Sequence, residues 1–426
     1  MIVKVSPARL SGAVAAPPSK SLAHRALLCA GLAQGESALT GISDSQDMLA
    51  TLDGLAALGA SARREPDGTL RVRGADFPRA LGPRRVFCRE SGSTLRFLIP
   101  LFALSPEETV FTGSPRLLAR SQSVYADLFR EEGLPFSQQP DALRIRGPLR
   151  GGELTLRGDV SSQFLTGLLF ALPLLPGDSA LQILPPFSSR GYVDLTLQML
   201  ARFGVRAGFA GENRLEIPGG QRYRSRDVAV EGDYSQAAFF AVAGAVQGGV
   251  RLSNLAPDSL QGDRAILSIL RACGARLLPE PDGVGFAAAP LTGREIDVDP
   301  IPDLAPVLSV LGLYASGQTR LVNAGRLRDK ESDRIAAMEE ELRRLGARVS
   351  STRDSLTVEG FPGGRAAFPE TAVDCHNDHR VAMSLAIAAT LGSAPLILRG
   401  AEAVNKSYPN FFADLSALGG NVEVLE

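Results

Sequence analysis

Lysine is scarce in this chain, although positive charge is not. Only four of the 45 lysine and arginine residues are lysines: Lys4, Lys20, Lys330 and Lys406. Because the chain uses arginine almost wherever a cation serves, each remaining lysine marks a place where a compact ammonium suits better than a planar guanidinium. Histidine is scarcer still, with His24 four positions after Lys20 and the close pair His376 and His379. The rare residue types are therefore concentrated at a few places.

Cysteine is also rare, and its copies lie far apart in the sequence. The four residues are Cys29, Cys88, Cys273 and Cys375. No two of them form a C-x-x-C pair, which argues against a disulfide framework or a zinc site and favours free thiols in a reducing cytosol. We therefore predict no metal and no cofactor.

The chain also lacks an excess of charge and any long unbroken apolar run. Its net charge is −1, so it has no broad basic face for nucleic acid, and a cationic site must be local. Residues 1–5 predict a strand and lack the apolar core of a signal peptide. The apolar stretch 381–398 contains Gly392, Ser393 and Pro395 and predicts a buried helix followed by a strand. We expect a cytoplasmic protein that binds neither nucleic acid nor membrane.

A sixfold repeat organises the 426 residues, which are too many for one ordinary core. An amphipathic helix that ends in glycine, followed by an alternating strand, recurs every 70 to 74 residues. Each glycine lies where a helix end needs a left-handed residue. The sixth copy stops one strand short, and the strand at residues 2–6 is expected to supply it. The repeat glycines are Gly59, Gly133, Gly204, Gly274, Gly346 and Gly419.

Each copy also contains a second helix that is apolar on all sides and must be buried. These helices begin with small or polar residues, and their N-termini offer unpaired N–H groups and partial positive charge. Six such ends directed at one space would form an anion site. The alternative is that these residues are ordinary N-caps. The helices begin at 19–21, 91–93, 161–163, 233–235, 302–303 and 377–379.

The segment 326–334 combines cations and a carboxylate. On a helix beginning near Asp329, Lys330 and Arg334 would lie one turn apart with Glu331 beside them. Such an arrangement can hold an anion and move a proton next to it. The alternative is a solvated helix start with capping acids.

Ten short motifs, in order and spacing, resemble the 5-enolpyruvylshikimate-3-phosphate synthase family over essentially the whole chain. Each motif is weak by itself, but their joint order is specific. Glu90 and Ser93 stand where the family often has Asn and Thr, and Arg326 where Asn is common, which leaves glyphosate sensitivity open. The motifs lie at 18–25, 90–96, 112–120, 160–164, 188–192, 231–233, 301–303, 330–334, 377–380 and 406–409.

The resemblance implies a mixed α/β fold of two similar domains, each of three βαβαββ repeats around buried parallel helices. The active site would lie in the cleft between the domains, which close on the substrates. We expect one domain over 15–227 and the other over 1–14 and 228–426, in a monomer.

The implied reaction transfers the enolpyruvyl group of phosphoenolpyruvate to the 5-hydroxyl of shikimate 3-phosphate and releases phosphate through a tetrahedral intermediate. This is a step of the shikimate pathway to chorismate and the aromatic amino acids. One carboxylate takes the hydroxyl proton and another acid protonates the methylene carbon. We predict Asp303 as the first group and Glu331 as the second, with Lys20 as a possible proton carrier.

Matching positions also imply the residues that bind each substrate. Arginine forks suit the carboxylate and phosphate of phosphoenolpyruvate, and a glycine at a helix start admits close backbone approach. The residues expected at shikimate 3-phosphate are Lys20, Ser21, Arg25, Ser161, Ser162, Gln163, Ser189, Tyr192, Asp303, Arg326 and Lys330. Those expected at phosphoenolpyruvate are Lys20, Gly92, Arg120, Gln163, Arg334, Arg380 and Lys406.

Two other functions remain as alternatives. UDP-N-acetylglucosamine enolpyruvyl transferase shares the implied fold but presents a cysteine on a mobile loop, and residues 112–120 contain none. A noncatalytic or RNA-directed relative, similar to RNA 3′-phosphate cyclase, is disfavoured by the near-zero net charge and by the presence of Asp303 and Glu331.

Overall fold

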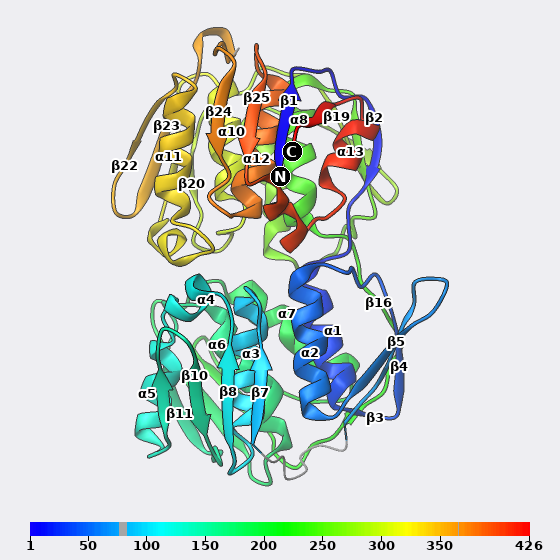
Figure 1. The fold of residues 1–426 in the computed structure, drawn as a ribbon, viewed down its shortest axis with the longest axis vertical. Helices are drawn as coiled ribbons and strands as arrows, with labels where there is room; N and C mark the ends of the chain where they lie inside the picture. Colours follow the sequence, from blue (N-terminus) through cyan, green and yellow to red (C-terminus); the bar gives the residue numbers. More distant parts are fainter. Residues whose placement is uncertain (76–82, 365) are drawn as a thin grey trace. The chain divides into compact units, whose positions relative to one another are not determined.

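The computed structural model describes residues 1–75, 83–364 and 366–426, and the chain divides into two compact units (Figure 1). Unit 1 contains Met1–Pro17 and Glu231–Glu426, and unit 2 contains Pro18–Val230. Each unit has its own hydrophobic core. None of the described helices has the length and apolar character needed to span a membrane.

Unit 2 contains three four-stranded sheets, ordered β16-β4-β6-β5, β7-β8-β10-β9 and β11-β12-β14-β13, and a short pair β15-β3. Its helices are α1 (Lys20–Leu32), α2 (Gln46–Leu58), α3 (Gly92–Phe102), α4 (Pro115–Ala119), α5 (Ser123–Glu131), α6 (Ser162–Ala171), the 3-10 turn η1 (Leu172–Leu174) and α7 (Arg190–Arg202). Its strands are β3 (Ala33–Gln34), β4 (Glu36–Thr40), β5 (Ser61–Arg64), β6 (Leu70–Arg73), β7 (Arg84–Phe87), β8 (Glu108–Thr112), β9 (Phe136–Gln138), β10 (Leu143–Arg146), β11 (Glu153–Arg157), β12 (Ser179–Leu184), β13 (Gly208–Phe209), β14 (Arg214–Ile217), β15 (Tyr223–Arg224) and β16 (Val228–Ala229).

Unit 1 contains three further four-stranded sheets, ordered β18-β19-β17-β2, β20-β21-β23-β22 and β24-β25-β1-β26. Its helices are α8 (Tyr234–Gln247), η2 (Gly262–Arg264), α9 (Ala265–Ala272), α10 (Ala305–Tyr314), η3 (Gly325–Asp329), α11 (Arg334–Arg344), η4 (Pro362–Gly364), α12 (His379–Leu391), η5 (Ala401–Lys406) and α13 (Phe411–Ala417). Its strands are β1 (Ile2–Ser6), β2 (Gly12–Ala15), β17 (Val250–Ser253), β18 (Arg276–Glu280), β19 (Gly283–Ala287), β20 (Glu295–Asp297), β21 (Gln318–Val322), β22 (Arg348–Ser351), β23 (Ser355–Glu359), β24 (Thr371–Asp374), β25 (Leu396–Arg399) and β26 (Asn421–Val424).

One plan is common to these six sheets. In each sheet the strand at one edge pairs in parallel with its neighbour, and the other two strands are antiparallel to the strands beside them. An example is β11-β12-β14-β13, in which β11 and β12 are the parallel pair. A parallel pair needs a crossover, which the buried helix α6 provides between β11 and β12. The expected mixed α/β class is therefore confirmed.

Three strands come from distant parts of the chain. Strand β2 precedes α1 in sequence but pairs with β17 in unit 1, whereas β16 precedes α8 but pairs with β4 in unit 2. Strand β1 lies between β25 and β26. The chain therefore crosses between the units twice, and each unit is completed by strands that are remote in sequence.

The helices at the centre of each unit are buried almost completely, because their sequences are apolar on every side. In α12 every residue from His379 to Thr390 is buried, and in α10 all ten residues are. Side chains cap most of these helices: Ser19 caps α1, Ser91 caps α3, Ser161 caps α6, Asp233 caps α8 and Asp378 caps α12. The buried helix starts thus satisfy some of their own N–H groups.

Strand β1 offers a test of how strongly the N-terminus closes its sheet. Val5 is fully buried, so Val5→Ala should lower the free energy of unfolding by about 1–3 kcal/mol, the cost of removing two buried methyl groups. Lys4→Gln is the control, because its ion pair with Glu370 is partly exposed. Urea unfolding of both variants measures the difference, and equal midpoints would contradict the role of β1.

Candidate active site

Arg334 is the centre of a cluster of charges in unit 1. Its Nη1 lies 2.9 Å from Asp303 Oδ1, its Nη2 lies 3.0 Å from Glu331 Oε2, and its Nε lies 2.8 Å from Asp378 Oδ2. Only 1% of its side chain is exposed. Burial alone would lower the pKa of Arg334, but Asp378, Glu331 and Asp303 raise it above its ordinary value. The guanidinium therefore remains charged.

The helix in this segment begins later than its sequence predicts. Residues 325–329 form the 3-10 turn η3, Lys330 is extended, and α11 starts at Arg334 with Asp333 as its cap. The expectation of a helix from near Asp329 is therefore wrong, because the side chain of Asp333 accepts the N–H of Ala336 and starts the helix there. Glu331 still reaches Arg334, but from the turn that precedes the helix.

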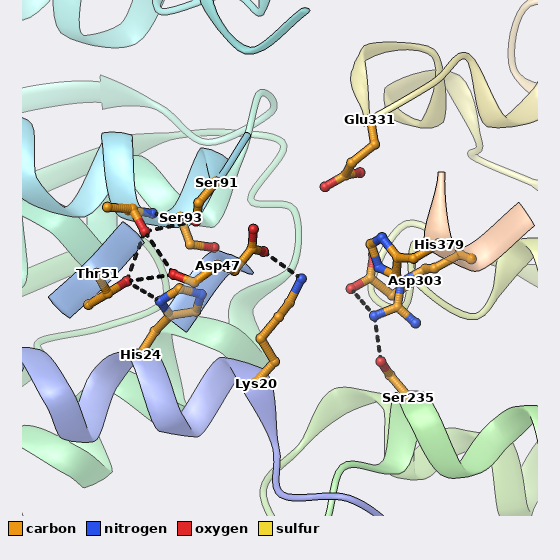
Figure 2. Close-up of polar contacts among 12 residues, drawn as sticks. Lys20, His24, Asp47, Thr51, Ser91, Ser93, Ser235, Asp303, Glu331 and His379 are labelled. Carbon is orange, nitrogen blue, oxygen red and sulfur yellow. Dashed lines mark hydrogen bonds and ion pairs between the residues drawn. The ribbon is translucent and has the colours of Figure 1, made fainter. Parts of the chain in front are cut away.

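Arg380 is the second buried arginine of this cluster. Its Nη2 donates to Asp303 Oδ2 at 2.9 Å and to Ser235 Oγ at 2.6 Å, and Figure 2 shows the side chains of these two acceptors. Its Nε and Nη1 are buried without a hydrogen-bond partner among the described residues. A buried guanidinium with two vacant donors is suited to bind an oxyanion.

Asp303 joins both arginines. Burial alone would raise the pKa of its carboxyl, but Arg380, Arg334 and Lys330 together lower it below the ordinary value, so the group is ionised. Asp303 does not cap α10: the residue at the cap is Leu304, and it makes no side-chain cap hydrogen bond. The N-cap alternative therefore fails for Asp303, whose carboxylate is held by arginines.

Lys330 adjoins the same cluster. Burial lowers its pKa to about 7, with Arg326 and Arg334 acting in the same direction and Asp303 opposing them. Its ammonium can therefore release a proton near neutral pH. The guanidinium of Arg326 is held 2.9 Å from Asp299.

The predicted residue Lys406 and its neighbour Asp378 complete the unit 1 cluster. The ammonium of Lys406 donates to the carbonyl of Asn377 at 2.6 Å. The next residue, Asp378, caps α12 and accepts from Ser332 Oγ at 3.1 Å. Lys406 is therefore anchored beside the start of α12.

Lys20 forms an ion pair in unit 2. Its Nζ lies 3.0 Å from Asp47 Oδ2, with 16% and 12% of the two side chains exposed. Figure 2 shows the chain of contacts beside this pair, in which His24 Nδ1 lies 2.7 Å from Thr51 Oγ1. Thr51 in turn contacts Thr94, which donates to the cap residue Ser91. The contacts thus connect the starts of α1 and α3 through α2.

Arg25 and His24 are both buried in α1 but differ in charge. Burial, and then Lys20 and Arg25, lower the pKa of His24 well below its ordinary value, so its imidazole is neutral. Burial also lowers the pKa of Arg25, to about 10, which leaves it charged at neutral pH. The hydrogen bonds of Arg25 go to uncharged oxygens of Ser21, Thr196, Tyr192 and Thr166.

Gly92 starts α3 next to a buried guanidinium. A Cβ at this position would lie 2.7 Å from Arg120 Nη1, so glycine allows Arg120 to lie against the helix start. On the same helix, Arg96 Nη1 donates to Gln163 Oε1 at 2.8 Å, and Gln163 Nε2 donates to Ser93 at 2.9 Å. The amide of Gln163 is therefore fixed between α3 and α6.

Four predicted residues lie at the starts of α6 and α7. Ser161 caps α6 through the N–H of Gln163, and Ser162 is the buried first residue of that helix. Ser189 precedes α7 in a left-handed conformation, with φ 56°, and Tyr192 follows in its first turn. The backbone oxygen of Tyr192 holds Arg25.

One group of acidic and histidine side chains comes close together outside the predicted site. Ligand-type atoms of Glu340, Glu341 and His376 lie within 4.8 Å of one another. The guanidinium of Arg344 lies 3.5 Å from the Glu341 carboxylate and 2.6 Å from that of Glu340, so one cation already lies beside both acids. The absence of a metal and of a cofactor from the function stays a prediction.

Sequence reasoning brought together most of these residues but missed three. Asp47, Arg96 and Asp378 each hold a predicted residue, namely Lys20, Gln163 and Arg334. Arg96 and Asp378 lie inside motifs that the sequence already singled out. Nothing in the sequence around Asp47 marks it, because its partner lies on another helix.

The mixed α/β fold and the buried arginine–carboxylate cluster define a protein equipped to bind anions. The EPSP synthase (3-phosphoshikimate 1-carboxyvinyltransferase) family matches the chain over residues 5–415. The chain belongs to this family, which confirms the resemblance, the transferase class and the fold class.

Individual relatives agree with this assignment. The 3-phosphoshikimate 1-carboxyvinyltransferases of Clostridium kluyveri and Clostridium beijerinckii are both 42% identical to the chain. The alignments cover 99% and 98% of this chain and 98% and 97% of those proteins. The solved structure of EPSP synthase from Acinetobacter baumannii superposes with a TM-score of 0.80 at 26% identity, covering 99% of this chain and 100% of that one.

The four lysines allow a direct test of the lowered pKa of Lys330. Because an amine reacts with acetic anhydride only when deprotonated, Lys330 should be acetylated with a midpoint near pH 7, against an ordinary lysine value near 10.5. Competitive labelling read by mass spectrometry follows all four lysines in one sample. Lys4, whose side chain is partly exposed, is the internal control for reagent reactivity, and a Lys330 midpoint near the ordinary lysine value would contradict the assignment.

Proposed function

We propose that the chain transfers the enolpyruvyl group of phosphoenolpyruvate to the 5-hydroxyl of shikimate 3-phosphate and releases inorganic phosphate. The observation that supports this most is the unit 1 cluster, in which Asp303 joins two buried arginines beside a lysine with a pKa near 7. Membership of the EPSP synthase family supports the same reaction. The cluster combines anion binding with groups that can exchange protons.

Phosphoenolpyruvate carries a carboxylate and a phosphate, and both need cationic donors. The proposed contacts of this substrate are Lys20, Gly92, Arg120, Gln163, Arg334, Arg380 and Lys406. The Nε and Nη1 of Arg380 supply donors that no described residue satisfies. Arginine forks match planar and tetrahedral oxyanions, whereas a lysine contributes a point charge.

Shikimate 3-phosphate is proposed to bind next to Arg25. This guanidinium is buried, and the hydrogen bonds that it makes within the described part of the chain go to uncharged oxygens, so an anionic or hydroxyl-rich ligand would complete its environment. Hydroxyl groups and the fixed amide of Gln163 lie at the neighbouring helix starts. The proposed contacts are Lys20, Ser21, Arg25, Ser161, Ser162, Gln163, Ser189, Tyr192, Asp303, Arg326 and Lys330.

The addition step needs a base and an acid. The oxygen of the 5-hydroxyl forms a bond to C2 of phosphoenolpyruvate while Asp303 accepts the hydroxyl proton. Glu331 or Lys20 protonates C3. The low pKa of Asp303 in the free protein comes from its arginines, so an anion that binds these arginines raises it toward a value useful for a base. Elimination then removes a proton from the new methyl group and breaks the C2–O bond to phosphate.

The decisive assay measures phosphate release from phosphoenolpyruvate. We expect release only when shikimate 3-phosphate is also present, in buffer with a metal chelator. UDP-N-acetylglucosamine alone should give none, and release with that acceptor would overturn the proposal. Tight, strongly salt-dependent RNA binding would instead favour the RNA-directed alternative.

Substitutions in the cluster separate the proton-transfer roles. Glu331→Gln keeps an oxygen for Arg334 but cannot donate an acidic proton, and Asp303→Asn removes the base. Each should lower kcat by about 100-fold or more, the size expected for loss of general acid–base catalysis. Glu359→Gln, in an exposed ion pair with Arg348, is the control. Circular dichroism checks the fold, and near-normal kcat in Glu331→Gln would move the proton-donor role to Lys20.

Gly92→Ala tests the phosphoenolpyruvate contacts of unit 2. The added methyl group would displace Arg120, so KM for phosphoenolpyruvate should rise about tenfold, as for one lost charged hydrogen bond. Gly177→Ala is the matched control, because a Cβ there meets open space. Initial-rate kinetics with each substrate varied measure both variants. An unchanged KM in Gly92→Ala would remove Arg120 from the proposed site.

We also propose that the protein acts as a monomer in the cytoplasm. Its free cysteines support a reducing compartment such as the cytoplasm. Analytical ultracentrifugation at several protein concentrations tests the monomer, and a stable dimer would contradict it.

A further inference from the structure

Helix α11 contacts the segment before α12 at two points. At the start of the helix, Arg334 Nε lies 2.8 Å from Asp378 Oδ2. Seven residues later, which is two helical turns, Glu341 Oε1 lies 3.0 Å from His376 Nε2. The two contacts lie on the same side of α11 because residues seven apart share a helix face. The segment 376–378 is therefore held at both ends.

The backbone between these contacts adopts an uncommon conformation. His376 and Asn377 have φ angles of 51° and 50°, in the left-handed region that few residues other than glycine occupy. Two consecutive residues of this kind are strained unless their surroundings fix them. The N–H of His376 donates to Asp374 Oδ1 at 2.5 Å, and the N–H of Asp378 donates to Cys375 at 2.9 Å.

Glu341 is a buried carboxylate for which the proposed mechanism has no use. Its side chain has no exposed surface, and its Oε2 has no hydrogen-bond partner among the described residues. The half-exposed Arg344 lies 3.5 Å from that oxygen, so His376 supplies the only hydrogen bond that the Glu341 side chain has in the part of the chain described. A buried carboxylate is costly unless it is paired, which makes this contact one that the structure must keep.

We infer that the Glu341–His376 pair is a positioning device that holds the left-handed turn at 376–377 against α11 and thereby places Asp378 and Arg380. Asp378 binds Arg334 and caps the helix that begins His379-Arg380, so a shift of the turn moves both buried arginines. The inference rests on the proposed function in one respect, namely that these arginines bind phosphoenolpyruvate.

The charges around His376 give the device a dependence on pH. The hydrogen bond that His376 donates to Glu341 raises the pKa of His376 above its ordinary value, burial opposes this, and the charges of Glu341, Asp374 and Glu340 add to the increase. Arg344 faces the same carboxylate from α11, and Lys406 of η5 lies against the carbonyl of Asn377. Because the folded-state pKa is raised, the ion pair contributes fully below the unfolded value near 6.5 and weakens as pH rises through the folded value.

Glu341→Gln is the principal variant, because it removes the buried charge while it preserves shape and an oxygen acceptor. We expect KM for phosphoenolpyruvate to rise about tenfold, as for a lost charge-assisted hydrogen bond, with KM for shikimate 3-phosphate unchanged. Glu340→Gln is the matched control on the neighbouring, exposed position of α11. His376→Gln keeps a donor toward Glu341 and should retain a KM within about threefold of the wild type, as expected of a neutral hydrogen bond.

Two further readouts separate positioning from a merely structural role. NMR titration of the three histidines should give His376 a pKa above its ordinary value, which falls in Glu341→Gln and falls by much less in Glu340→Gln, because Glu341 is the larger cause. The ratio of the wild-type KM for phosphoenolpyruvate to the KM of His376→Gln should rise as pH passes the measured His376 pKa, because only the wild type loses a charged histidine. Titration of Lys330 is common to both proteins and cancels in this ratio.

Distinct outcomes overturn the inference and the proposed function. The inference fails if Glu341→Gln leaves KM for phosphoenolpyruvate unchanged, whether or not the His376 pKa or the melting temperature falls, since the pair would then be structural only. Arg380→Gln is measured beside it. If that variant also leaves KM unchanged, the proposed role of the arginines fails; if it raises KM while Glu341→Gln does not, only the positioning role fails.

Discussion

The charge of Arg334, buried among three carboxylates, is the interaction on which the rest of unit 1 depends. Removing one partner of a buried ion pair costs about 3–5 kcal/mol, because an unpaired charge is left in a medium that solvates it poorly. Asp303, Glu331 and Asp378 come from three separate segments, so satisfying one guanidinium fixes the approach to α10, the turn before α11 and the start of α12 together. The geometry of the cluster and the stability of the unit are therefore linked.

The need of a buried charge for a partner also bears on the charges of each unit. In unit 1 the arginines are matched by carboxylates, and yet Arg380 retains two donors that no described residue pairs. In unit 2 Arg25 is buried among uncharged oxygens, and Lys20 pairs with the carboxylate of Asp47. Unit 1 thus contains a buried positive charge whose donors the described residues satisfy only in part. An anionic ligand would supply the missing partner, which agrees with membership of a family that transfers a carboxyvinyl group.

The buried helices place these groups because their own sequences leave them no other position. An element that is apolar on all sides, such as α10 or α12, must lie at the centre of its unit, and its polar first turn then comes to the end of the core. The first residues of such helices lie in the partial positive charge of the helix N-terminus, which favours a bound anion. The proposed proton-transfer groups and anion donors therefore come from helix starts and from the turns just before them, while the sheets outside carry few of the predicted residues.

The sequence by itself determined the sixfold repeat, the mixed α/β class, the family and most residues of the two clusters, because periodic apolar patterns and ordered motifs are local properties of the chain. The sequence pattern predicted a start of α11 that is too early. The helix begins only where the side chain of Asp333 caps it, and the charged residues before Asp333 do not reveal that they form a turn. Only the tertiary structure decided that β2 and β16 complete sheets remote from their neighbours in sequence, that Asp47 pairs with Lys20, and that Glu341 meets His376. Each of these contacts joins segments that are far apart in the chain, and no local sequence pattern predicts it. These contacts form because burial and charge pairing stabilise them in the folded units.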